Sequence, residues 1–115
     1  MPQIARKLRR RHLIYYLRVF ERESGELLGH LVDITPEGIL LMGERDIAPG
    51  TGFTMTMDLP TEICGRPKVQ FTGRCVWART DPVTGLRDTG FKLDDLPLPE
   101  LNVIGVLIDD YGFRD

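Results

Sequence analysis

The 115-residue sequence has few of the side chains that build metal and redox sites: two cysteines and two histidines. Cys64 and Cys75 form no CxxC pair and are too few for a disulfide framework, so we expect buried or partly buried free thiols. His12 and His30 have no Ser, Cys or acidic residue at a spacing that suggests a catalytic set. The composition therefore favours neither a metal centre nor an enzyme.

Long apolar runs are also missing. None approaches the ~18 residues that a membrane span needs, and the basic N-terminus lacks the apolar segment of a secretory signal. We therefore expect a cytoplasmic protein without a membrane span. Hydrophobic residues make up 42% of the sequence and charged residues 28%, which is close to the globular average, and the length suits one domain.

The net charge of −2 conceals an uneven distribution. Five of the fifteen positive charges lie within residues 6–11, which leaves ten positive charges against seventeen negative ones in residues 12–115, a net −7. We expect a basic arm at 1–12 attached to an acidic domain at 13–115. This distribution indicates an anionic partner at one end of the molecule, and neither DNA nor RNA is expected as a partner.

Short β-prone runs separated by turn residues occupy most of the chain. The six expected strands lie within residues 14–20, 27–34, 39–42, 53–59, 69–78 and 89–93. In the fifth strand, period-two alternation places one set of side chains on a common face: Val69, Phe71, Gly73, Cys75 and Trp77. We therefore expect Trp77 in the core or at the lip of the fold, and not as a stacking platform.

Apolar spacings of three and four predict a C-terminal helix over residues 98–109, despite the cost of about 1 kcal/mol for Gly105 in a helix interior. Six short strands are too many for one flat sheet of this size. We predict an all-β fold, a six-stranded antiparallel split β-barrel, with the C-terminal α-helix covering an opening or flank. Whether the chain is a monomer or a dimer stays open.

Two local motifs suggest a ligand. Arg6 and Arg10 form an RxxxR pattern before the first strand, and Asp33, Thr35 and Gly38 form a [D/N]x[S/T]xxG pattern at the end of the second. In this order the motifs resemble the PilZ domain family, and the resemblance covers nearly the whole chain. It implies a non-enzymatic bacterial receptor that has no cofactor, binds the second messenger cyclic di-GMP and acts on a protein effector.

The residue types suit such a ligand, which carries two phosphates and two guanines. Arg6 and Arg10 can place bidentate forks on phosphate or on guanine O6 and N7. Asp33 can accept hydrogen bonds from guanine N–H groups, and the Thr35 hydroxyl can bond a base or a phosphate. Gly38 allows a positive φ or a close approach of the backbone to the ligand.

Several alternatives remain open at the level of sequence. Arg9 and Arg11 are also candidate ligand contacts, because Lys7 and Arg11 stand four apart as well. Residues 33–38 also suit a structural turn, with the glycine in the left-handed region. A PilZ-like adaptor could bind protein without nucleotide, through the apolar residues 12–17 or the helix face. A barrel that binds single-stranded nucleic acid through its arm is disfavoured by the acidic domain.

Overall fold

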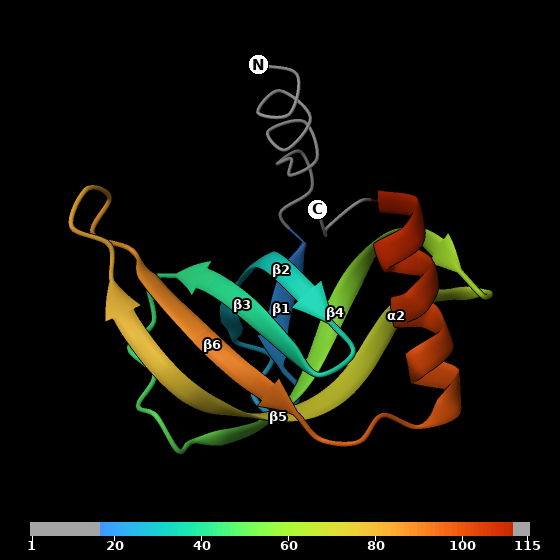
Figure 1. Ribbon diagram of the computed structural model, residues 1–115, viewed down its shortest axis with the longest axis horizontal. Coiled ribbons are helices and arrows are strands. Elements are labelled where there is room, and N and C mark those ends of the chain that lie inside the picture. The colour runs from blue at the N-terminus through green and yellow to red at the C-terminus, as the bar shows by residue number, and fades with distance from the viewer. Residues whose placement is uncertain (1–16, 112–115) are drawn as a thin grey trace.

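The computed structural model describes residues 17–111 of the chain, which form six strands and one helix (Figure 1). The predicted arm at 1–12, its boundary with the domain, and Arg6, Arg9, Arg10 and Arg11 lie outside the described residues. In chain order the elements are β1 (Arg18–Glu21), β2 (Leu27–Thr35), β3 (Gly38–Gly43), β4 (Gly52–Ile63), β5 (Arg66–Thr80), β6 (Arg87–Leu93) and α2 (Leu98–Tyr111).

The strands form a closed barrel in the order β1-β2-β3-β6-β5-β4. Every neighbouring pair is antiparallel, and β1 closes the barrel by pairing with both β2 and β4. Closure removes the exposed sheet edges that would otherwise invite pairing with another chain. The predicted six-stranded antiparallel barrel with one C-terminal helix is confirmed.

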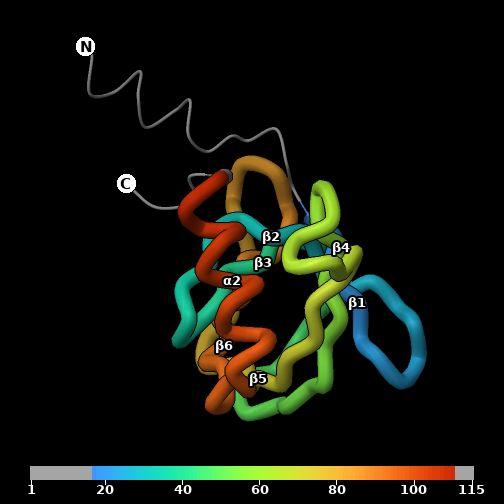
Figure 2. Tube along the Cα trace, turned by 90° about the vertical axis from the view of Figure 1, so that its right-hand side faces the viewer, coloured from blue at the N-terminus to red at the C-terminus, as the bar shows by residue number. Residues whose placement is uncertain are grey.

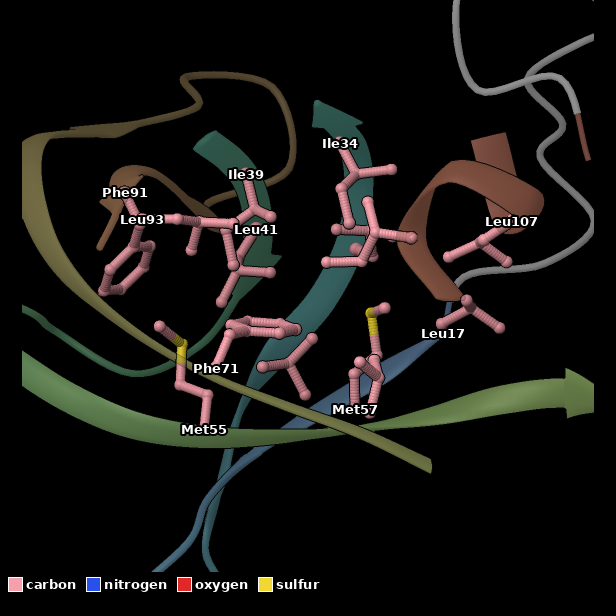
Figure 3. Close-up of a cluster of buried hydrophobic side chains, with 14 of the residues drawn as sticks. Leu17, Ile34, Ile39, Leu41, Met55, Met57, Phe71, Phe91, Leu93 and Leu107 are labelled. Carbon is pink, nitrogen blue, oxygen red and sulfur yellow. The ribbon is translucent and has the colours of Figure 1, made fainter. Parts of the chain in front are cut away.

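The core fills the barrel and continues under the helix (Figure 3). Alternate residues of β4, such as Met55 and Met57, point inward, as period-two patterning predicts. Helix α2 packs against β5, β2 and β4, and Figure 2 shows it running along one side of the barrel. Its buried face consists of Val103, Ile104, Leu107 and Ile108.

The beginning of α2 and the beginning of the described chain are each held by a contact with a strand. Arg66 at the start of β5 forms an ion pair with Glu100 in the first turn of α2. At the other end of the chain, the Leu17 carbonyl accepts a hydrogen bond from the Leu31 N–H (2.8 Å). Leu17 belongs to the same buried cluster as Leu107 of α2 (Figure 3).

The two cysteines have different environments, and the prediction for one of them is wrong. Cys75 is buried and free, as expected, and this burial raises the pKa of its thiol, which donates a hydrogen bond to the Trp77 carbonyl (3.4 Å). Cys64 is free but exposed, because it lies in the two-residue turn between β4 and β5 with a φ of 52°. Turn residues point toward solvent even when the flanking strands are buried.

The prediction for Trp77 is also wrong with respect to its face. Val69, Phe71, Gly73 and Cys75 do face the core, but Trp77 is 42% exposed. A β-bulge explains the change, because Cys75 pairs with Phe91 whereas Trp77 pairs with Gly90, so that Val76 is an extra residue. One extra residue in a strand reverses the direction of every side chain that follows it.

Candidate ligand-binding surface

The β2–β3 turn carries the second sequence motif and is held in shape by its own threonine. Pro36 and Glu37 form the turn between Thr35 and Gly38. The Thr35 Oγ1 accepts hydrogen bonds from the N–H groups of Glu37 (3.2 Å) and Gly38 (3.1 Å). In this conformation the hydroxyl oxygen stabilises the turn, which fixes where the motif side chains lie.

Gly38 is required by the barrel itself. It is not among the residues with positive φ, so the predicted left-handed conformation is wrong. A Cβ atom at this position would lie 2.8 Å from the Phe91 carbonyl oxygen, which is closer than real Cβ atoms approach. Glycine at this position therefore permits the backbones of β3 and β6 to approach each other closely beside the turn.

Asp33 points outward because of a second β-bulge. Leu31 pairs with Leu41 and Asp33 pairs with Leu40, so Val32 is an extra residue in β2. In an unbroken register Asp33 would oppose Ile39, which is buried. The bulge instead exposes the Asp33 side chain, whose Oδ1 accepts a hydrogen bond from the Ile34 N–H (2.9 Å).

The two bulges place Asp33 and Trp77 at opposite ends of one row across the outer wall of the barrel. Asp33 pairs with Leu40, Leu40 with Gly90, and Gly90 with Trp77, across the strands β2, β3, β6 and β5. We call this row the shelf. Three strand spacings of about 4.8 Å separate the backbones at its ends, roughly 14 Å in all.

Trp77 leans over the middle of the shelf. A Cβ atom on Gly90 would lie 2.2 Å from the Trp77 Nε1, so the indole occupies the space that any larger residue at 90 would fill. The guanidinium of Arg79 lies 5.9 Å from the indole centroid and also pairs with Asp88 (3.3 Å). The surface therefore offers a carboxylate, an apolar floor, an indole and a cation within one area.

A shallow cavity of about 250 Å³ lies on the shelf. Its lining includes all three residues of the sequence motif, Asp33, Thr35 and Gly38, together with Val76 and Trp77 of β5. The structure thus brings the predicted turn residues together, and it adds Trp77, which was expected in the core or at the lip of the fold. Gly90, a glycine inside a β-prone run, was the available signal that a side chain packs closely there.

Metal sites and membrane spans were considered for the part of the chain that the structure describes. Among residues 17–111, no group of three or more His, Cys, Asp or Glu side chains is placed to hold a metal ion. No helix within the same residues is long and apolar enough to cross a membrane.

Comparisons with known proteins agree with the fold. The family model described as PilZ domain matches residues 6–110, which includes the RxxxR motif. No curated protein matches the sequence. A solved structure of the Bacillus subtilis inhibitor of motility (MotI/DgrA) has a TM-score of 0.64 and 14% sequence identity. The match covers 81% of this chain and 45% of that chain, so our chain spans less than half its length, and the likeness concerns the fold alone.

Proposed function

The chain belongs to the PilZ domain family, and from this membership we propose that it is a non-enzymatic cytoplasmic receptor that binds cyclic di-GMP on the shelf. The observation that carries the proposal is the row from Asp33 to Trp77, which two bulges turn to the outside. It offers a hydrogen-bond acceptor for guanine N–H groups at one end and a π-face for a purine ring at the other.

The two phosphates of the ligand require positively charged partners. The shelf itself supplies only part of this positive charge. We propose that Arg6 and Arg10 bind them, with Arg9 and Arg11 as the alternative contacts. Guanidinium groups bind phosphate through paired, charge-assisted hydrogen bonds. Binding would close the arm across the shelf, and the resulting surface would change the contacts of the protein with an effector.

Trp77 is the only tryptophan of the chain, so intrinsic fluorescence tests the proposal directly. We expect cyclic di-GMP to change the emission in a saturable manner, and isothermal titration to give the same affinity. Cyclic di-AMP is the matched control, because it has the same two phosphates without the guanine edges. An absence of heat and of emission change at tens of micromolar cyclic di-GMP would exclude the proposed function.

Arg10→Ala should weaken cyclic di-GMP binding by about 10- to 100-fold, because it removes a charge-assisted contact worth roughly 1.5–3 kcal/mol. Arg22→Ala is the control, since it removes one positive charge from the exposed β1–β2 turn. Isothermal titration of both variants measures the difference. Unchanged affinity in Arg10→Ala would move the assignment to Arg9 or Arg11.

A second candidate is an adaptor of the same family that binds protein without nucleotide. The observation that favours it is the solvent-facing side of α2, where Leu98 is 66% exposed and Leu101 is 38% exposed. This candidate predicts that alanine at Arg6 and Arg10 leaves the cellular phenotype intact. It also predicts no saturable binding of cyclic di-GMP to the folded protein.

A further inference from the structure

The β2–β3 turn separates two hollows on the barrel surface. The shelf lies on one side of the turn and contains Asp33, Thr35 and Gly38. On the other side, Pro36 and Glu37 line a cavity of about 550 Å³ together with residues of the end of β6, of the segment that follows it, and Leu101 of α2. We call this cavity the acidic groove.

The acidic groove combines negative charge with an apolar surface. Glu37, Asp94 and Asp95 contribute three exposed carboxylates, against which the lining offers a single cation, Lys92. The apolar part includes Leu96 and Leu101. A groove of this composition fits a basic segment that carries an apolar residue.

The acidic groove and the ligand-binding turn are mechanically connected. The Leu93 N–H, at the end of β6, donates a hydrogen bond to the carbonyl oxygen of Glu37 in the turn (2.9 Å). The same turn therefore supplies residues to both hollows and is tied to the strand that leads into α2. A segment that lies in the groove therefore contacts one side of the turn, and the other side of the same turn faces the shelf.

We propose that the arm of this chain, residues 6–11, occupies the acidic groove when no ligand is on the shelf. The arm carries five positive charges around a single leucine, Leu8, which matches three carboxylates around an apolar floor. The inference rests on the proposed function, because the arginines that would bind cyclic di-GMP are then held on the opposite side of the turn. Ligand and groove compete for the same arm.

The arm can reach the groove from the point where it leaves the described fold. Leu17 lies in the buried cluster that includes Leu107 of α2, and Leu101 is six residues earlier on that helix, about 9 Å along its axis. The nine residues from Leu8 to Leu17 span up to about 30 Å when extended. Exposed ion pairs are individually weak and are screened by salt, so a ligand with two phosphates can displace this docking.

The first experiment examines the groove without any ligand. In the ligand-free full chain, Leu8→Asp removes the apolar anchor and adds a like charge, so we expect the backbone amide NMR signals of Glu37, Asp95 and Leu101 to shift. Leu8→Met is the control and should leave these signals in place. Unchanged groove signals in Leu8→Asp would overturn the proposal, and shifts that depend on protein concentration would assign the groove to the arm of a second copy.

The second experiment measures competition. The double variant Asp94→Asn/Asp95→Asn should bind cyclic di-GMP about 3- to 10-fold more tightly, because a larger fraction of the arm is available to the ligand. Glu44→Gln/Glu62→Gln is the matched control, since it removes the same two charges from exposed positions outside the acidic groove. An equal gain in affinity for both double variants would show that the effect comes from the net charge of the protein. It would overturn the proposed competition between the groove and the ligand.

The two experiments separate this inference from the proposed function. If cyclic di-GMP does not bind but the groove signals respond to Leu8→Asp, the proposed function fails and the docking of the arm stands. If cyclic di-GMP binds with equal affinity to the wild type and to both double variants, and the groove signals do not respond to Leu8→Asp, the receptor stands and the groove inference fails.

Discussion

At the scale of single residues, two glycines have opposite surroundings. A Cβ on Gly90 would collide with the Trp77 indole, whereas a Cβ on Gly105 in α2 would meet nothing within 4 Å. We expect Gly90→Ala to displace the indole from the shelf, to destabilise the fold by about 1 kcal/mol and to weaken cyclic di-GMP binding. Trp77 fluorescence and urea denaturation measure these effects.

Gly105→Ala is the matched control for this substitution. It should stabilise the protein by up to about 1 kcal/mol, because alanine is favoured over glycine in a helix interior. It should leave the Trp77 emission unchanged. Identical emission spectra for Gly90→Ala and the wild type would contradict the packing of the indole on Gly90.

The two thiols provide a second residue-scale prediction. Cys64 is exposed and should react with Ellman's reagent in the native protein, whereas Cys75 is 1% exposed and should react only after unfolding.

Burial raises the pKa of Cys75 in the folded state. Its contribution to stability is therefore present below the ordinary thiol pKa and is lost as the pH rises through the folded pKa, because the unfolded thiol releases its proton first.

The pH dependence is measured as urea stability between pH 8 and pH 10. Wild-type protein should lose more stability over this interval than Cys75→Ala, which lacks the titrating group. Equal losses in the two proteins would show that the Cys75 thiol ionises alike in the folded and unfolded states. In the reaction with Ellman's reagent, equal rates for Cys64 and Cys75 in the native protein would contradict the burial of Cys75.

At the scale of elements, the β2–β3 turn depends on one hydroxyl. Thr35→Ala removes the acceptor of two backbone N–H groups and should cost about 1–2 kcal/mol of stability. Thr35→Ser keeps the oxygen and should cost less, so the pair separates the hydroxyl from the methyl group. Chemical denaturation of both variants tests the role of Thr35, and equal stability of Thr35→Ala and wild type would contradict it.

The strands also show where a sequence pattern stops predicting which side chains face inward. Period-two alternation located the inward residues of β5 as far as Cys75, because this stretch keeps a constant register with its neighbours. It failed beyond Cys75, where Val76 is inserted. A bulge is defined by the pairing of two strands, so one strand read alone does not reveal it.

At the scale of the whole molecule, α2 completes the core. Leu107 is fully buried, and we expect Leu107→Ala to destabilise the protein by about 2–5 kcal/mol, because the remaining side chains do not collapse fully into the space. Leu98→Ala, in the same helix but largely exposed, should change stability by no more than about 0.5 kcal/mol. Urea denaturation compares them, and equal losses would contradict the packing of α2 on the barrel.

The sequence by itself determined the six strands, the terminal helix, the barrel and the position of the motif turn. These follow from local information, namely the alternation of apolar residues, the glycines and prolines between runs, and the helical spacing after residue 97. The family resemblance rested on the same kind of information, because both of its motifs are short and continuous.

Tertiary structure decided which side chains meet. Only the pairing of β2, β3, β6 and β5 places Asp33 and Trp77 in one row, and only the approach of β6 explains the glycine at 38. Asp33 and Trp77 are 44 positions apart in the sequence. Their alignment depends on strand register and on two bulges, which are set by contacts between distant segments and not by the residues of either strand alone.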